Sequence, residues 1–564
     1  MNTFNKIIAT TLVAGSLLMS GCNPDEFLTE VNPNAITEDT FWKTEGDAEA
    51  ALTTVYAALQ FPCISGGNLT FEMAKSDIAG TNDWTRHFSF TEFTTADNEH
   101  AVLGTWAELY TGIFRANQVI DNIPTMEALS DERKIEIVAQ AKFLRAFYYF
   151  NLIHTYGKAI IKLDSKTNNH NVPLSTMAEV QEQVIFPDLE YAIEHLPIVL
   201  ESQQLGRVAR GAAITLLGKT YLYNKDWDMA AAEFKKVIDS GLYTLVPNFM
   251  DNFRGDIAFN SESIFEVPYD GSINPGTANA DMTDDDPNNS GGESTGMSRT
   301  YGPYSLGGWQ MIMPTYFMHE LMTADSVANS TAHSSRYTAT LAGIDAEGLY
   351  YNKTTAELKA EVGRRWAFGE SSYIKKYSNW YHQDLEDPEW RSSINYKQFR
   401  LSDVYLMYAE AVLEGKGDIV TAIEYIDKVR TRAGVVTLQD YINANGTIPQ
   451  LHVSKDLYGT RPEVSATVDN IRTHIRMVER PTELAFENSR WRDLVRWGIV
   501  KSVFTQHHED EVVRIERGPD PSRAPLYIQA RIRPDFVNNY NFYVAEKHDY
   551  FPIPAAEIQA NEAL

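Results

Sequence analysis

The 564-residue chain is poor in cysteine, with only Cys22 and Cys63, and poor in positive charge. Cys22 stands at the end of an N-terminal leader, so the body keeps one cysteine, which excludes an intramolecular disulfide and a cysteine metal site. Lysine and arginine number 49 against 76 acidic residues, and a formal net charge of −27 repels the phosphate backbone of nucleic acid. The 13 histidines show no metal-ligand spacing, and no run beyond the leader is long enough to span a membrane.

The first residues have the layout of a secretory signal peptide. Lys6 supplies a positive charge, an apolar stretch covers 7–19, and the small residues Ser20 and Gly21 follow. The segment 18–22 resembles a bacterial lipobox, in which the cysteine thiol takes a diacylglyceryl group and becomes the new N-terminus. We therefore expect a signal peptide over 1–21, lipid attachment at Cys22 and a lipidated tether over 22–33. Such a protein is anchored to a membrane by its lipid only.

Apolar residues recur with helical spacing over much of the body. Between 401 and 434 the pattern predicts two helices, broken by Gly415 and Gly417 and ended by Gly434, as in a tetratricopeptide-like unit. Further units are expected at 211–243, at 139–195, and from 48–59 together with 104–123. These units bury their apolar faces only by stacking on neighbours, so we expect one helical layer over about 40–245 and 400–434.

Between 247 and 400 the helical pattern fails. The stretch is rich in Gly, Asn, Asp, Ser and Pro but also in Tyr and Trp, whereas disordered segments are poor in aromatics. We expect ordered loops with short strands, packed on the helical layer, and long ordered loops are usually functional. The predicted fold is therefore mostly α: a tetratricopeptide-like repeat layer with a packed loop-rich region, in one domain over 34–564 that ends in a C-terminal region over 435–564.

Several motifs together are similar to the SusD/RagB family, the nutrient-binding outer-membrane lipoproteins of Bacteroidetes. They are Phe41-Trp42-Lys43-Thr44 with 47–51, Ala141-Lys142-Phe143-Leu144-Arg145-Ala146 with 148–150, 430–434, Arg480-Pro481-Thr482-Glu483-Leu484-Ala485-Phe486-Glu487 continuing to 498, and 551–558. The matches extend from the leader to the last residues. Asp25-Glu26, close to the lipid, resembles the signal that sends lipoproteins of these bacteria to the outer face of the cell.

The resemblance implies a SusD-like fold on a lipid-anchored outer-membrane protein that faces the cell surface. It also implies the binding of oligosaccharides or polysaccharide and their delivery to a SusC-like TonB-dependent transporter, without catalysis, cofactor or metal. The alternatives are a peptide-binding member of the same scaffold, a surface glycoside hydrolase, and a purely structural repeat protein. A hydrolase needs two facing carboxylates, one with a raised pKa, and no pair in the sequence stands out.

Sugar binding needs flat apolar ring faces with amide, carboxylate or guanidinium groups at their edges. Two loops offer both: 77–90, with Asn82, Asp83, Trp84 and Arg86, and 301–310, with Tyr301, Tyr304, Trp309 and Gln310. In the second loop, Gly307-Gly308 lets Trp309 stand out from the backbone. Third choices are Trp366 after Arg365, and Trp380-Tyr381 after Asn379. For each aromatic residue the alternative is burial in the core.

Other motifs are interpreted structurally. Arg480, Glu483, Glu487 and Arg490 have helical spacing, which predicts ion pairs along one helix face and not an acid–base couple. Gly292-Glu293-Ser294-Thr295-Gly296 lacks the strand–turn–helix context of a nucleophile elbow, and Gly218-Lys219-Thr220 lies in mid-helix, unlike a phosphate loop. The triplet 284–286 lacks the ligand spacing of a calcium loop.

Overall fold

The computed structural model describes residues 41–81, 85–167, 169–273, 293–327, 330, 332–343, 346–354, 357, 372–517 and 536–564. The signal peptide, Cys22 and the tether lie outside these residues. So do Asn82, Asp83, Trp84 and Trp366 of the predicted binding loops. In the part that is described, no helix combines the length and the apolar character needed to cross a membrane.

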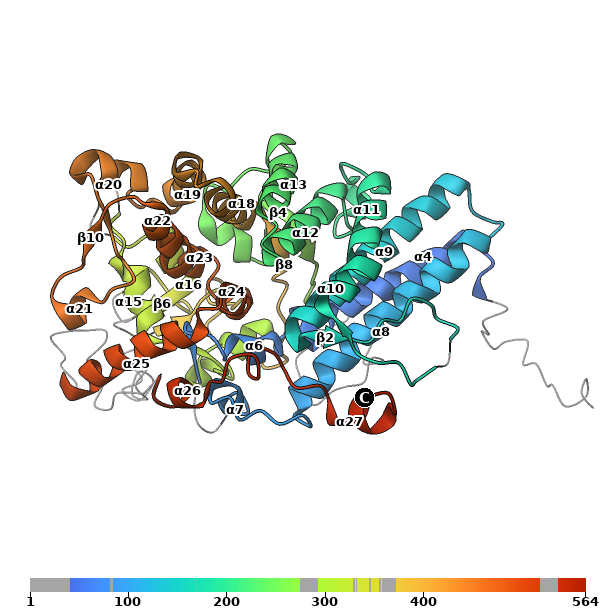
Figure 1. The fold of residues 1–564 in the computed structure, drawn as a ribbon, viewed down its shortest axis with the longest axis horizontal. Coiled ribbons are helices and arrows are strands. Elements are labelled where there is room, and N and C mark those ends of the chain that lie inside the picture. Colours follow the sequence, from blue (N-terminus) through green and yellow to red (C-terminus); the bar gives the residue numbers. More distant parts are fainter. Residues whose placement is uncertain are drawn as a thin grey trace, which may run out of the picture.

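A row of packed helices forms one layer of the molecule (Figure 1). The row consists of α4 (Glu45–Ala57), α8 (His100–Asn122), α9 (Asp131–Tyr156), α11 (Phe186–His195), α12 (Arg210–Tyr223), α13 (Trp227–Asp239), α18 (Leu401–Lys416) and α19 (Ile419–Ala433). Each helix packs on the next in this order, although more than 150 residues separate α13 from α18 along the chain. The helical pairs expected from the apolar spacing are therefore present, and they stack as one layer.

Glycines set the ends and the spacing of these helices. Gly417 and Gly434 end α18 and α19 with φ of 64° and 78°, values that favour glycine. In α12, a Cβ added to Gly218 would lie 2.8 Å from the Phe234 ring of α13, so this glycine allows the two helices to approach closely. The motif Gly218-Lys219-Thr220 is thus part of helix packing, as predicted.

The loop-rich region contains short antiparallel strand pairs, as the fold prediction expected. They are β1 (Ala79–Gly80) with β5 (Met313–Pro314), β4 (Ser263–Val267) with β8 (Tyr396–Arg400), and β6 (Leu341–Gly343) with β7 (Ser372–Ile374). Phe265 of β4 and Phe399 of β8 face each other in register and both lie against Phe147 of α9, at ring distances of 6.2 and 6.3 Å. Through these ring contacts, the loop-rich region packs against the helical layer.

Short helices precede or lie between these strands along the chain. They are α5 (Pro62–Ser65), α6 (Leu69–Met73), α7 (Phe88–Thr91), α14 (Met297–Tyr301), α15 (Tyr316–Ala324) and α16 (Ser335–Thr340). The sequence pattern missed α15 because its nine residues are fewer than the window of about 11–18 residues in which helical periodicity can be recognised. Thr315 caps its start by accepting a hydrogen bond from the Met318 amide.

The C-terminal part returns to the N-terminal helices (Figure 1). It contains α20 (Leu438–Asn445), β9 (Ile448–Pro449), α21 (Lys455–Tyr458), β10 (Glu463–Val464), α22 (Val468–His474), α23 (Arg480–Glu483), α24 (Arg490–Trp497), α25 (Val500–Arg517), α26 (Val537–Phe542) and α27 (Ala555–Ala560). Three further short elements of the N-terminal half lie between α9 and α11: β2 (Lys158–Ala159), β3 (Ser175–Thr176) and α10 (Met177–Val180). The Phe551 amide donates to the Thr155 carbonyl, 2.7 Å away, at the end of α9. Near the chain end, the Ala555 amide donates to the Asp97 carbonyl at 3.1 Å.

The predicted ion pairs of the segment 480–490 exist, but their partners are not along one helix face. Helix α23 ends at Glu483, and Phe486 and Asn488 then adopt φ of 59° and 57°. Arg480 donates to Asp493 at 2.7 Å and to Asp403 at 2.8 Å, while Glu483 accepts from Arg400 at 2.5 Å. These carboxylates and guanidiniums are buried, so the segment fastens several elements together and offers no acid–base couple.

Candidate functional site

Two tryptophans from separate loops meet at the surface of the loop-rich region. The rings of Trp309 and Trp390 lie 4.9 Å apart at 67°, and both are half-buried. The Arg299 guanidinium lies 5.6 Å from the first ring and 5.0 Å from the second, within cation–π range. Tyr304, from the same loop as Trp309, is 71% exposed. Tyr304, Trp309, Trp390 and Arg299 are called the aromatic patch below.

Backbone geometry places Trp309. Gly307 has a φ of 92°, and a Cβ added to Gly308 would lie 2.0 Å from the Gly302 carbonyl oxygen. Only glycine fits this close approach, so the loop can turn back on itself. The Trp309 amide then donates to the Arg299 carbonyl at 2.7 Å. The glycines thus hold Trp309 beside Arg299 through the backbone.

A polar cavity of about 490 Å³ is lined in part by the loop that carries Trp390. Its walls include Arg254, Asp256, Tyr381, His382, Asp387 and Arg391. The volume falls within the roughly 300–1,000 Å³ that is typical of small-molecule sites. The turn 387–390, closed by a 2.9 Å hydrogen bond from the Trp390 amide to the Asp387 carbonyl, contributes Asp387 to the polar cavity and Trp390 to the aromatic patch.

Ion pairs line the polar cavity. Arg254 donates to Asp256 through Nε at 2.8 Å and Nη2 at 2.5 Å, and its guanidinium lies 5.3 Å above the Tyr381 ring. Arg391 binds Asp387 at 3.2 Å through Nε and at 3.1 Å through Nη2. The hydrogen bond from Arg254 lowers the pKa of the Asp256 carboxyl, so this group is ionised at neutral pH.

A buried carboxylate fastens the loops around the polar cavity. Glu386 accepts hydrogen bonds from the Ser298 hydroxyl at 2.7 Å, from the Tyr351 hydroxyl, and from the Asn379 side chain at 3.3 Å. Its amide donates to the Leu306 carbonyl at 2.8 Å. Burial raises the pKa of Glu386, and the donors around the carboxyl oppose this effect. Through its side chain and its amide, Glu386 thereby connects the segments around Ser298, Leu306, Tyr351 and Asn379.

The predicted binding residues lie in different environments in the structure. Asn82, Asp83, Trp84 and Trp366 lie outside the described residues, and Arg86 is exposed just after the first of these gaps. Tyr304 and Trp309 belong to the aromatic patch, and Tyr381 lines the polar cavity. Trp380 is half-buried, with the Lys375 ammonium 3.7 Å from its ring centre.

Two predicted ligand contacts need correction. Tyr301 is 1% exposed, and its hydroxyl donates to the Phe486 carbonyl at 3.2 Å. Gln310 is 6% exposed, and its side-chain oxygen accepts from the Tyr304 amide at 3.2 Å. Both side chains support the loop from inside, so we remove them from the set of ligand contacts.

Sequence reasoning missed Trp390 and both ion pairs of the polar cavity. Trp390 stands between polar neighbours in Asp387-Pro388-Glu389-Trp390-Arg391, the same combination that singled out Trp309. Its partner, the Arg299 guanidinium, donates to the Pro388 carbonyl at 2.7 Å. Arg254 and Asp256 carry no such local signal, because Tyr381 reaches them only in the fold.

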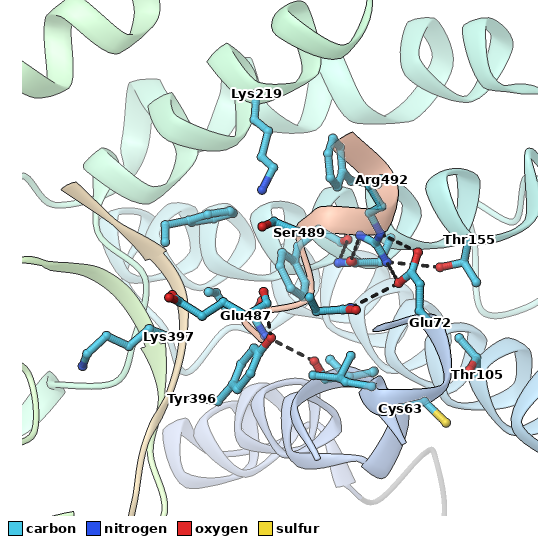
Figure 2. A pocket seen from close by; sticks show the side chains of 18 of the residues that line it. Cys63, Glu72, Thr105, Thr155, Lys219, Tyr396, Lys397, Glu487, Ser489 and Arg492 are labelled. Carbon is cyan, nitrogen blue, oxygen red and sulfur yellow. Dashed lines mark hydrogen bonds and ion pairs between the residues drawn. The ribbon is translucent and has the colours of Figure 1, made fainter. Parts of the chain in front are cut away.

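A second cavity lies inside the protein, between α6, α9, α12, β8 and the segment 484–492 (Figure 2). Arg492 donates to Glu72 through Nε and Nη2, both at 3.0 Å, and Lys219 points toward the same space from α12. The volume is about 80 Å³, well below the roughly 300 Å³ at which ligand pockets begin. Cys63 lines this cavity as a buried thiol with a pKa raised by burial, as expected for an inert cysteine. We therefore place the candidate site at the aromatic patch and the polar cavity.

Comparison with known proteins agrees with the fold. Residues 261–564 match the family model described as SusD family, and residues 26–222 match the model described as starch-binding associating with outer membrane. The chain is 27% identical over 540 residues to SusD-like protein P25 of Formosa agariphila, covering 88% of this chain and 91% of that protein.

Solved structures give the same result. A SusD superfamily protein from Bacteroides vulgatus superposes with a TM-score of 0.73 at 24% identity, over 93% of this chain and 98% of that one. A protein described as a laminarin binding SusD-like protein superposes with a TM-score of 0.67 at 23% identity, over 92% and 98%. Since a single family model matches more than half of its residues, the chain belongs to the SusD family, whose members include glycan-binding proteins.

Proposed function

We propose that this chain is a cell-surface lipoprotein that binds oligosaccharides and hands them to a SusC-like TonB-dependent outer-membrane transporter. The observation that carries the proposal is the pair of half-buried indoles, Trp309 and Trp390, beside a polar cavity of about 490 Å³. Ring faces accept the apolar face of a sugar, and ion-paired side chains at the edge bond its hydroxyls. Family membership, and a structural neighbour described as laminarin binding, support a saccharide as the ligand.

The chain is proposed to bind without cutting bonds. A glycoside hydrolase needs one carboxyl group with a raised pKa facing the scissile bond. In the polar cavity the pKa of Asp256 is lowered by its hydrogen bond from Arg254. The pKa of Glu386 is raised by burial, but its oxygens accept hydrogen bonds from Ser298 and Tyr351 inside the protein. Release of new reducing ends from a bound polysaccharide would contradict this part of the proposal.

Binding can be tested by affinity electrophoresis and calorimetry against a panel of polysaccharides. We expect Trp309→Ala and Trp390→Ala each to weaken binding by on the order of tenfold, from a wild-type dissociation constant roughly in the micromolar to millimolar range. Trp84→Ala, chosen from the sequence alone, is expected to act in the same direction. Phe542→Ala is the matched control, because Phe542 of α26 is 48% exposed and lies outside the proposed site. Unchanged affinity in both the Trp309 and Trp390 variants would contradict the site.

The anchor and the transporter need separate tests. Cys22→Ala is expected to move the protein from the membrane fraction to the soluble fraction, since acylation at this residue is the proposed anchor. A variant that stays in the membrane fraction would argue against lipid attachment there. Co-purification of a TonB-dependent transporter with the tagged wild-type chain from detergent-solubilised outer membranes tests the partner.

A further inference from the structure

The polar cavity offers hydrogen-bond donors and acceptors in fixed pairs. Arg254 and Asp256 form a two-bond fork, and Arg391 and Asp387 form a second pair. All four side chains also line the cavity. Each pair therefore presents guanidinium N–H donors beside carboxylate lone pairs, and the side chains of Arg254 and Arg391 remain 34% and 33% exposed.

The charges of the polar cavity balance within the chain. Each arginine is matched by its own aspartate, and Glu389 adds a further carboxylate 3.5 Å from Arg391. Burial lowers the pKa of His382, which keeps this imidazole neutral at pH 7. A sulfate or carboxylate on a sugar would lie beside the aspartate of the same ion pair, and both this carboxylate and a chain with a net charge of −27 repel an anion.

Among the described residues that line it, the polar cavity has one tyrosine and no tryptophan. This tyrosine, Tyr381, has the Arg254 guanidinium 5.3 Å from its ring, and its hydroxyl accepts a 2.6 Å hydrogen bond from the Gly255 amide. The two tryptophans of the site, Trp309 and Trp390, pack on each other, and Trp390 belongs to the turn 387–390. Asp387 and Arg391 face the cavity while Trp390, between them in sequence, lies against Trp309. A single ligand that contacts both the polar cavity and the aromatic patch would therefore contact this turn.

We infer that the polar cavity is the subsite for an uncharged saccharide unit, whose neighbouring hydroxyls bridge the guanidinium of one ion pair and its carboxylate, while an adjoining unit of the same glycan lies on the aromatic patch. This inference rests on the proposed function and adds to it the class of glycan and a second subsite. A pair of adjacent hydroxyls can donate to the aspartate and accept from the arginine at once, without breaking the pair. An anionic unit matches only the arginine.

The test uses pairs of polysaccharides with the same backbone, one neutral and one sulfated, such as dextran with dextran sulfate and galactan with carrageenan. Wild-type protein is expected to bind at least one neutral member and to bind its sulfated counterpart at least tenfold more weakly. Asp256→Asn and Asp387→Asn each remove a charged acceptor and are expected to weaken neutral-glycan binding by on the order of tenfold. In the double variant Asp256→Asn/Asp387→Asn, both guanidiniums lose their charged partners. We therefore expect a smaller ratio between the affinity for the neutral polysaccharide and the affinity for its sulfated counterpart.

The matched control is Asp239→Asn, which opens the exposed Lys235–Asp239 pair of α13 and is expected to leave both affinities unchanged. Thermal melting of each variant shows whether it is folded. Binding of sulfated polysaccharides alone overturns the inference and leaves the proposed function standing. So does a result in which the Trp309 and Trp390 variants lose affinity while the Asp256 and Asp387 variants do not. If wild-type protein binds no glycan of the full panel, the proposed function fails and the inference fails with it.

Discussion

Arg490 donates two hydrogen bonds to Asp77, from Nε to Oδ1 at 2.7 Å and from Nη2 to Oδ2 at 2.6 Å, across 413 residues of sequence. Asp77 lies two residues before the start of β1, which pairs with β5, and the Asp77 carbonyl accepts a hydrogen bond from the Thr315 hydroxyl at 2.8 Å. Since β5 follows Trp309 by a few residues, this ion pair connects the C-terminal part of the chain to the loop that carries the aromatic patch.

Breaking this pair should destabilise the fold. Asp77→Asn or Arg490→Gln leaves the remaining charge buried without its partner, which we expect to lower the free energy of unfolding by roughly 3 kcal/mol. Urea unfolding followed by circular dichroism measures the loss. The exposed pair Lys235–Asp239 provides the control, and Asp239→Asn should cost less than about 1 kcal/mol. If the two buried variants matched this control, the pair would not have the stabilising role assigned to it.

Acid should destabilise the protein through its buried carboxylates. Burial would raise the pKa of Asp77 and of Glu479, but Arg490 beside the first, and Arg336 and Arg430 beside the second, lower both pKa values well below the usual range. A carboxyl whose pKa is lower in the folded than in the unfolded chain adds stability above its unfolded pKa of about 4, and this stability is lost as the pH falls toward the folded value.

We therefore expect the urea midpoint to fall progressively as the pH is lowered from about 5 to 3. Glu479→Gln should be less stable than wild type at pH 7 and should show a shallower loss on acidification, because one of the groups responsible is gone. A midpoint that stays constant from pH 5 to 3, or an unchanged slope in this variant, would contradict the assignment.

The loop of Trp309 should not tolerate a side chain at Gly308. In Gly308→Ala the new Cβ would meet the Gly302 carbonyl, so the loop must shift and glycan affinity should fall at least as far as in Trp309→Ala. Calorimetry on the same polysaccharide measures this. Gly46→Ala is the matched substitution, since its Cβ would have only Thr44 Oγ1 at 3.6 Å and would lie inside α4. It should keep full affinity and gain up to about 1 kcal/mol of stability, and equal affinities in the two variants would contradict the role of Gly308.

The helical layer could be predicted because each helix is marked by the apolar spacing and the terminal glycines of its own segment. The apolar spacing and the terminal glycines of 401–434 contain both helices of that unit, and α18 and α19 occur where the pattern placed them. Helix α15 was not predictable, because its nine residues make only about two and a half turns, too few for the apolar period to be recognised. The segment 480–490 shows another limit: helical spacing suggested pairs within one helix, whereas Arg480 and Glu483 find Asp403 and Arg400 on other elements.

Part of the candidate site followed from composition and part did not. Aromatic residues among polar neighbours indicated Trp309, Tyr304 and Tyr381, which line the surface or its cavity. The same rule also selected Tyr301, whose ring is buried, because composition does not state which way a side chain points. The polar cavity itself forms where segments near 254, 271 and 379–393 come together in the fold. These contacts are between residues far apart in sequence, so no local sequence pattern predicts them.

Glu386 holds the loops of the site in place, whereas other residues line the polar cavity. Ser298, Tyr351 and Asn379 all donate hydrogen bonds to this carboxylate, whereas His382 and Gln383 line the cavity and, in the part of the chain that the structure describes, form no hydrogen bond with it. Substitutions of His382 or Gln383 should therefore alter the lining of the cavity without breaking the hydrogen bonds of Glu386. To redesign ligand preference, one would therefore substitute His382 and Gln383 and keep Glu386 unchanged.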